Sequence, residues 1–172
     1  MATPHLAGSA AVVRQQHPTW SAAEVRSAVV NTADQDALKT YDTAKPQDDV
    51  NVIGAGRENL LAAVGARLAL DPVSVSFGAV PSGSGQSRSV AVTVTSLGAG
   101  GSFSLTVADV TSSGVSFAVS PSTLTLGAGE SGTVTVTMSA AKGAALKGHQ
   151  AMLSVSSGVL EVAHAAVYTL VK

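Results

Sequence analysis

Two patterns of apolar and polar residues divide the chain. In residues 1–70 the apolar positions recur every three or four residues, as over residues 22–29, which predicts amphipathic helices. In residues 71–172 they alternate with Ser and Thr, as over residues 89–97, which predicts half-buried strands. We therefore expect an α + β chain in two parts, 1–70 and 71–172. Asp71-Pro72 is the expected joint, because proline disfavours helical geometry in the residue before it.

The helix signals in the first part include a capping box. Ser21 can accept a hydrogen bond from the Glu24 amide, and the Glu24 side chain can reach back to Ser21. We expect this helix to end near Asn31. Two further helices, over residues 6–13 and 58–67, and a polar loop over residues 34–51 complete the predicted elements.

The second part predicts seven or eight short strands separated by glycine-rich turns. So many short strands in about 100 residues favour an all-β sandwich of immunoglobulin-like or fibronectin-like type. The chain has no cysteine, so the fibronectin-like variant is favoured over a true immunoglobulin domain. The expected strands are residues 73–77, 89–97, 103–107, 115–119, 123–126, 133–138, 150–155 and 159–168.

Composition excludes several classes of function. The net charge is −1 and charged residues make up 12%, so there is no basic stripe and we expect no nucleic-acid partner. No apolar run approaches the ~20 residues that a membrane span needs. The absence of cysteine rules out disulfides, thiolate metal sites and a cysteine nucleophile. The N-terminal sequence has no basic segment followed by an apolar core, so it does not read as a signal peptide.

One motif points to a family. Residues 1–8, MATPHLAG, resemble the segment after the catalytic serine of subtilisin-like serine proteases, which reads Gly-Thr-Ser-Met-Ala-Thr/Ser-Pro-His-Val-Ala-Gly. Leu6 replaces the usual Val. Residues 17–33 resemble the next helix of that family, and residues 54–59 resemble its closing segment, where Glu58 departs from the common Val. The resemblance covers the first seventy residues, as a helical part of a subtilase α/β catalytic domain. The predicted sandwich looks like the fibronectin-like module that often follows such domains.

The resemblance implies that the catalytic residues lie upstream of this chain in a longer protein. The family's nucleophilic Ser immediately precedes the residue matching Met1, and its Asp, His and oxyanion Asn lie further upstream. We therefore expect the chain to be the C-terminal fragment of a secreted endopeptidase acting on a polypeptide substrate. Its catalytic residues, and the upstream segment that is its partner, would lie before Met1. By itself it is expected to be inactive, with no catalytic, cofactor-binding or metal-binding residue.

A non-catalytic reading remains open. The helices would then be vestigial, and an extracellular sandwich would bind a partner through its loops. The candidate loops are Pro81–Arg88, Ala108–Gly114 and Ala140–His149. None of them carries the aromatic platform that sugar binding favours.

The histidines are tempting but weak candidates for chemistry. His5 could be taken for a triad histidine, but the resemblance gives it a structural place on the helix behind the serine. His17, His149 and His164 show no mutual spacing typical of a metal site. We expect them to be exposed or satisfied by hydrogen bonds.

An acidic stretch raises the question of calcium, which carboxylate oxygens suit and which the family often binds. No Asp-x-Asp-x-Asp-Gly pattern occurs, so a solvated loop is the favoured interpretation, and any calcium is expected in the full-length parent. The residues are Asp34, Asp36, Asp42, Asp48 and Asp49.

The apolar character of the first helix carries a further expectation. A helix that is apolar on every side is normally buried, and the family's covering sheet would lie upstream. Leu6, Val12 and Val13 should then face the sandwich, a partner chain or water. Because three short helices make a poor core, we expect residues 1–60 to be loosely packed and residues 71–172 to fold alone.

Overall fold

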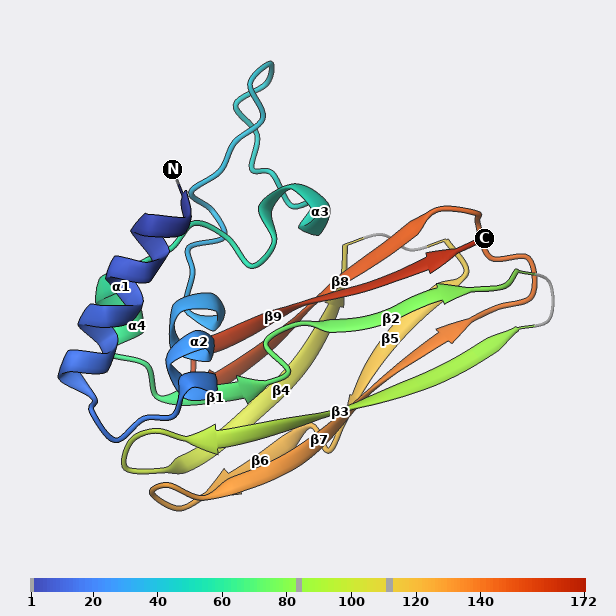
Figure 1. Cartoon of the computed structure of the whole chain (residues 1–172). Coiled ribbons are helices and arrows are strands. Elements are labelled where there is room, and N and C mark those ends of the chain that lie inside the picture. The colour runs from blue at the N-terminus through green and yellow to red at the C-terminus, as the bar shows by residue number, and fades with distance from the viewer. Residues whose placement is uncertain (1, 83–84, 111–112) are drawn as a thin grey trace.

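The computed structural model describes residues 2–82, 85–110 and 113–172 (Figure 1). Helices occupy the first part and strands the second, which confirms the α + β composition. The helices are α1 (Ala2–Gln16), α2 (Ala22–Asn31), α3 (Val50–Ile53) and α4 (Leu60–Val64). The strands are β1 (Leu68–Asp71), β2 (Val75–Val80), β3 (Gln86–Ser96), β4 (Gly101–Asp109), β5 (Val115–Ser120), β6 (Thr123–Leu126), β7 (Ser131–Ala140), β8 (Gly148–Ser157) and β9 (Leu160–Val171).

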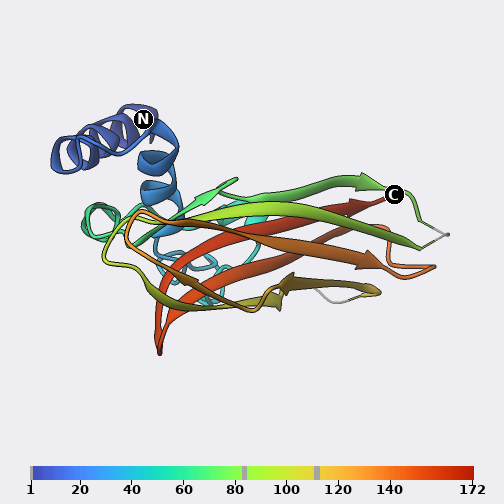
Figure 2. The same ribbon diagram turned by 90° about the horizontal axis from the view of Figure 1, so that it is seen from below.

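The strands form two sheets that pack as the layers of a sandwich. One sheet has the order β1-β3-β7-β5 and the other the order β2-β9-β8-β4-β6. Every pair is antiparallel except β2 with β9, which run parallel. Figures 1 and 2 show the helices gathered at one end of the sandwich and the C-terminus at the other. The eight predicted strands are confirmed, with ends that differ by a few residues.

Alternation along the strands builds the sandwich core. Val134, Val136 and Met138 on β7 are fully buried, while the threonines between them are partly exposed. Side chains of successive strand residues point to opposite faces, so a period of two places one set in the core. Apolar side chains of both sheets meet there in a single cluster.

The strand β1 was not predicted. Leu68, Ala69 and Leu70 are all buried, because β1 pairs with β3 in the sheet and α2 packs against it. A strand that is covered on both faces has a continuous apolar sequence and shows no alternation. The sheet therefore begins before the predicted joint at Asp71-Pro72.

The helix ends follow their capping residues. The Glu24 amide donates to Ser21 Oγ at 3.2 Å and the Ser21 amide donates to Glu24 Oε2 at 2.6 Å, so the predicted capping box is confirmed. Helix α1 is longer than predicted. Helix α4 is shorter than the predicted 58–67, because the Asn59 side chain accepts from the Ala62 amide and Gly65 ends the helix.

A second apolar cluster holds the helices together. It includes Val13 of α1, Val25 and Ala28 of α2, Ala63 of α4, and Trp20 from the turn between α1 and α2. Val13 thus faces this helical cluster, which corrects the expectation that it would face the sandwich, a partner or water. Packing of α2 against β1 likewise corrects the expectation of loose packing for that helix.

Helix α1 is covered along one side only. Its buried residues are Ser9 and Val13, whereas Leu6 is 44% exposed and Val12 is 38% exposed. The apolar sequence of this helix is therefore much less buried than such sequences normally are.

Candidate functional site

Residues 2–8 of the motif MATPHLAG form the first turns of α1. Residues 2–8 are all exposed, and the helix begins at the end of the molecule that carries the other helices (Figure 1). Ala2, His5 and Leu6 line a hollow of about 560 Å³ together with residues 55–58 and with Val29, Val30 and Ala33. The start of α1 and the segment that follows α3 therefore border the same hollow.

A second hollow follows the side of α1 that faces α2. It has a volume of about 460 Å³ and a mainly apolar lining. Leu6 and Ala10 contribute from α1, and Val25 and Val29 from α2. Its two charged residues are Arg14 and Arg26. The two helices thus present an open, mainly apolar surface.

The rings of His17, His149 and His164 contact carbonyl or carboxylate oxygens. His17 stacks on Trp20 with ring centroids 3.7 Å apart, and its Nε2 lies 2.8 Å from the carbonyl oxygen of Val64. His149 is fully buried, with Nε2 at 2.8 Å from the Ala145 carbonyl oxygen. Among residues 2–82, 85–110 and 113–172, no histidine ring is hydrogen-bonded to a hydroxyl group. The described residues therefore hold no serine–histidine pair of the kind that activates a nucleophile.

Two aspartates of the 34–49 stretch, Asp34 and Asp49, have separate partners. Asp34 Oδ1 accepts from the Asn59 amide group at 3.0 Å, and Asp34 Oδ2 lies 3.7 Å from the Arg57 guanidinium. Asp49 caps α3 by accepting from the Asn51 amide, and it also accepts from Gln150 Nε2 at 2.7 Å. These hydrogen bonds lower the pKa of Asp49, and the bond from the Asn51 main-chain amide has the largest effect. Within the described ranges no group of three acidic or histidine side chains is placed to hold a metal ion.

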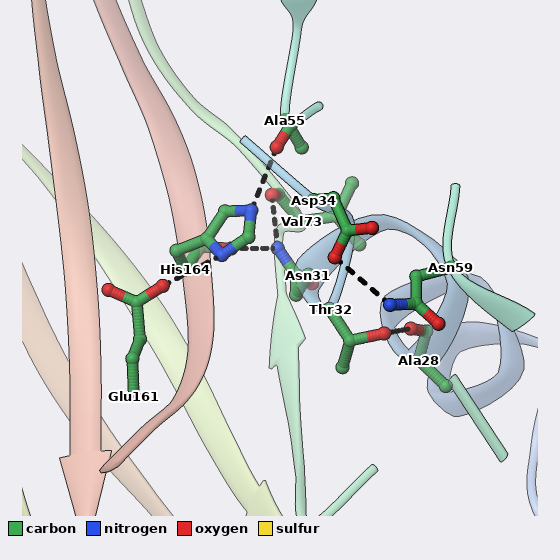
Figure 3. A network of polar contacts seen from close by, with 9 residues as sticks. All are labelled: Ala28, Asn31, Thr32, Asp34, Ala55, Asn59, Val73, Glu161 and His164. Carbon is green, nitrogen blue, oxygen red and sulfur yellow. Dashed lines mark hydrogen bonds and ion pairs between the residues drawn. The ribbon is translucent and has the colours of Figure 1, made fainter. Parts of the chain in front are cut away.

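The most connected polar site lies where the helices meet the sandwich (Figure 3). Asn31, at the end of α2, is fully buried. Its Nδ2 donates to the carbonyl oxygens of Val73 at 2.8 Å and His164 at 2.7 Å. Its Oδ1 accepts from Ser27 Oγ at 2.7 Å, and Ser27 Oγ in turn accepts from the Leu70 amide. One helical side chain thus joins α2 to β9 and to the segment after β1.

The His164 ring continues this connection. The ring is almost fully buried, with Nε2 at 2.8 Å from the Ala55 carbonyl oxygen and Nδ1 at 3.1 Å from Glu161 Oε1. The hydrogen bond from His164 is the first cause that lowers the pKa of Glu161, which keeps this carboxylate charged. The segment after α3 is thereby attached to β9.

The same segment is also attached to the end of α2. The Asp34 amide donates to the Arg57 carbonyl at 2.8 Å, and the Arg57 amide donates to the Asp34 carbonyl at 3.0 Å. Gly56 makes this approach feasible, because a Cβ there would lie 2.6 Å from the Asp34 carbonyl oxygen. Together, α2, β9 and residues 54–57 form a closed ring of contacts, which we call the junction ring.

The junction ring borders a cavity of about 530 Å³. Its charged lining comprises Asp34, Asp36 and Glu161 against Arg67, with His164 beside them. Sequence reasoning missed this site. The one available signal was that Ser27 and Asn31, four residues apart, are polar residues on the apolar side of a helix.

The first part of the chain has identifiable relatives. Residues 1–65 match the Subtilase family (Peptidase_S8). The match includes α1, α2, α3 and α4, and ends before β1. The likeness to the subtilase family thus covers the helical part of the chain.

Two curated proteins show the same likeness. The minor extracellular protease Vpr of Bacillus subtilis (strain 168) is 35% identical over 78 residues, which are 45% of this chain and 9% of that protein. Subtilisin BL of Lederbergia lenta is 54% identical over 33 residues, which are 19% of this chain and 12% of that protein. The chain thus spans about a tenth of the length of these relatives.

Solved structures resemble the sandwich only distantly. The C. elegans MSP family member WR4 has a TM-score of 0.41 at 10% identity, covering 62% of this chain and 99% of that one. The secreted serine protease VesC from Vibrio cholerae has a TM-score of 0.39 at 21% identity, covering 56% and 21%. Likeness at this level assigns the sandwich to no particular family.

Proposed function

We propose that this chain is the C-terminal part of a secreted subtilisin-like serine endopeptidase. In the full-length protein a serine one residue before Met1 would attack the peptide carbonyl, and a His, an Asp and an oxyanion Asn from upstream would complete the site. The chain itself would supply no catalytic residue. The observation that carries the proposal is the subtilase match over residues 1–65, together with an uncovered α1.

The position of α1 suits this role. A serine before Met1 would stand at the N-terminal end of a helix of 15 residues. The unpaired amides and the dipole at such an end favour negative charge, as develops on the attacking oxygen and on the carbonyl of an acyl-transfer intermediate. The chain would then contribute electrostatic support and a fixed position to a nucleophile that it does not carry.

The uncovered apolar surface supports an upstream partner. Leu6 and Val12 are 44% and 38% exposed, and the hollow between α1 and α2 is lined mainly by apolar groups. Burying such side chains stabilises a protein by about 1.5–3 kcal/mol each. We infer that the upstream part of the catalytic domain covers this surface in the full-length protein.

In this proposal the sandwich positions the catalytic helix. Helix α1 packs on α2 through Val13, and α2 is fixed to the sandwich by the buried bonds of Ser27 and Asn31. A path of buried contacts therefore runs from the sandwich to the helix behind the nucleophile. This role requires that residues 1–70 stay packed against the sandwich and do not move freely about the expected joint at residue 71.

Labelling with a fluorophosphonate probe tests the proposal. The chain as it stands should not be labelled, because the activated serine is absent. The same chain extended upstream through the serine and its partner residues should be labelled and should hydrolyse casein. Replacing the added serine with alanine is the matched control and should abolish both signals. Labelling of the present chain, or an extended protein that folds and stays unlabelled, would overturn the proposal.

A binding module is the second candidate, favoured by how the loops are placed. The described parts of the loops 81–88, 108–114 and 140–149 lie at the end of the sandwich away from the helices (Figure 1). The Ala141 amide donates to the Gly114 carbonyl at 2.7 Å, and the Ala145 amide donates to the Ser113 carbonyl at 3.2 Å. Residues 83–84 and 111–112 of these loops lie outside the described residues. Retention of the chain on a panel of immobilised proteins and glycans, lost when residues 141–146 are replaced, would support this second function.

A further inference from the structure

One side of β5 has no partner strand within the part of the chain that the structure describes. This strand is the last of its sheet and pairs only with β7. The Ala141 amide donates to the Gly114 carbonyl at 2.7 Å, in register with the β5–β7 ladder. Bonded and non-bonded pairs alternate in an antiparallel ladder, so the main-chain amides and carbonyls of Phe117 and Val119 point away from β7. Such groups form a template for another extended strand.

The accessible part of this edge runs from residue 117 to residue 120. Its start is covered, because the Ala145 amide donates to the Ser113 carbonyl at 3.2 Å and Val115 is only 3% exposed. Ala118 is exposed, with its small side chain on the outer face of the sheet. An approaching strand therefore meets no bulky side chain at the middle of the open stretch.

The other edge strands carry features that block pairing. The Leu70 amide of β1 donates to Ser27 Oγ of α2 at 2.7 Å. Arg88 of β3 donates to the Phe77 carbonyl of β2 at 2.9 Å, and the ladder of β2 has a register shift. Strand β6 has only four residues, and the part of β4 beyond β6 ends at the exposed Asp109. In contrast, β5 has six residues without a charge or a register shift.

We propose that β5 pairs antiparallel with the β5 of a second copy of this chain, about a two-fold axis at Ala118. Phe117 of each copy then exchanges hydrogen bonds with the partner's Val119. An axis at Phe117 would require Val115, which is covered. An axis at Val119 would require Pro121, which has no amide. Ala118 is therefore the centre that pairs both open residues.

A second copy fits this edge because a two-fold contact is self-complementary. An unpaired strand edge requires another extended strand, and β5 supplies one of the same length. The strand is uncharged, so two copies meet without like-charge repulsion between their strands. A contact of this size belongs to the small, transient interfaces, and its population rises with concentration. The inference goes beyond the proposed function and does not depend on it.

Charge repulsion tests the interface in the whole chain. Ala118→Lys places two ammonium groups directly opposite each other in the dimer. Ala91→Lys is the matched control, because Ala91 is exposed on β3, on the same face of the sheet. Sedimentation velocity at low salt follows the wild type and both variants over about a thousandfold range of concentration. We expect the wild type to dimerise. Ala118→Lys should raise the dissociation constant of the dimer about fivefold, the upper end for one cross-strand pair, and Ala91→Lys less than about twofold.

Cysteine cross-linking provides a second measurement in a chain that has no cysteine of its own. Residues that face each other in a non-bonded antiparallel pair have Cα atoms about 4.5 Å apart, which suits a disulfide. Oxidation should therefore join Ala118→Cys into a covalent dimer and leave Ala91→Cys monomeric.

A wild type that stays monomeric throughout would overturn the proposal and leave the edge to a strand of another protein. Equal weakening by the two lysine variants, or equal cross-linking of the two cysteine variants, would place the dimer contact on a different surface and would also overturn it. Because no activity is measured, these results are independent of the labelling test of the proposed function.

Discussion

The Nδ2 atom of Asn31 donates a hydrogen bond of 2.7 Å to the carbonyl oxygen of His164, a residue 133 positions further along the chain. The same nitrogen serves the Val73 carbonyl, and the Asn31 oxygen is occupied by Ser27. A fully buried amide with all of its polar atoms paired joins the subtilase-like helices to the sandwich. The two parts of the chain therefore share a buried polar interface.

Replacing Asn31 should destabilise the whole chain. Asn31→Ala leaves two buried carbonyls and the Ser27 hydroxyl without their partner, and each unpaired buried group costs about 1–3 kcal/mol. We expect the free energy of unfolding to fall by about 3 kcal/mol in urea titrations. Asn51→Ala, at an exposed position of α3, is the control and should change it by less than about 0.5 kcal/mol. Equal effects of the two variants would contradict the interface.

Gly56 should tolerate no side chain. Its φ is +129°, and an added Cβ would lie 2.6 Å from the Asp34 carbonyl oxygen, so Gly56→Ala should break the Asp34–Arg57 pairing. We expect a loss of more than about 2 kcal/mol from strain and lost contacts. Gly54→Ala, where φ is +58° and ψ is −122° but nothing blocks a Cβ, should be strained as well but should cost less than Gly56→Ala, because no backbone atom has to move. Thermal unfolding of both variants checks this order, and the reverse order would refute the account of the junction ring.

Acid should weaken the contacts of Asp49 with Gln150 and of Glu161 with His164. The folded-state pKa of both carboxyls is lowered, chiefly by the Asn51 main-chain bond for Asp49 and by the His164 bond for Glu161. A lowered pKa gives stability that is fully present above the unfolded-state value, about 4, and that is lost as the pH falls through the folded-state value. Urea unfolding at a series of pH values should show this acid loss.

The variant Asp49→Asn should show a smaller loss. Its side-chain oxygen can still cap α3, but it has no proton to bind in this range. An acid limb as steep as that of the wild type would mean that Asp49 does not contribute to it. Asp36→Asn, on an exposed aspartate, is the matched control and should leave the limb unchanged.

The two sides of α1 should respond differently to substitution. Val13→Ala removes methyl groups from a fully buried site in the helical cluster and should cost about 2 kcal/mol. Leu6→Gln changes a side chain that is 44% exposed and should alter the stability of this chain by less than about 0.5 kcal/mol. In the upstream-extended protein, Leu6→Gln should become destabilising, because the proposed catalytic sheet would cover it. Calorimetry of both variants in both forms checks this, and an unchanged Leu6→Gln effect would contradict the proposed covering.

Local patterns were sufficient to predict the local structure. The Ser21–Glu24 capping box places the start of α2, and alternation around Val134 and Val136 places β7. Strand β1 was not predicted, because Leu68–Leu70 are covered on both faces and their sequence therefore shows no apolar–polar alternation. The junction ring was not predicted for a different reason. Asn31 and His164 are ordinary residues within their own segments, and only the docking of α2 on β9 brings them together.

Reading the DNA immediately upstream of the Met1 codon tests the central claim most directly. The account predicts that the reading frame continues backwards as Gly-Thr-Ser, with codons for an Asp, a His and an Asn further upstream in the same frame. An in-frame stop codon directly before Met1, with no such sequence behind it, would contradict the account and favour a binding module.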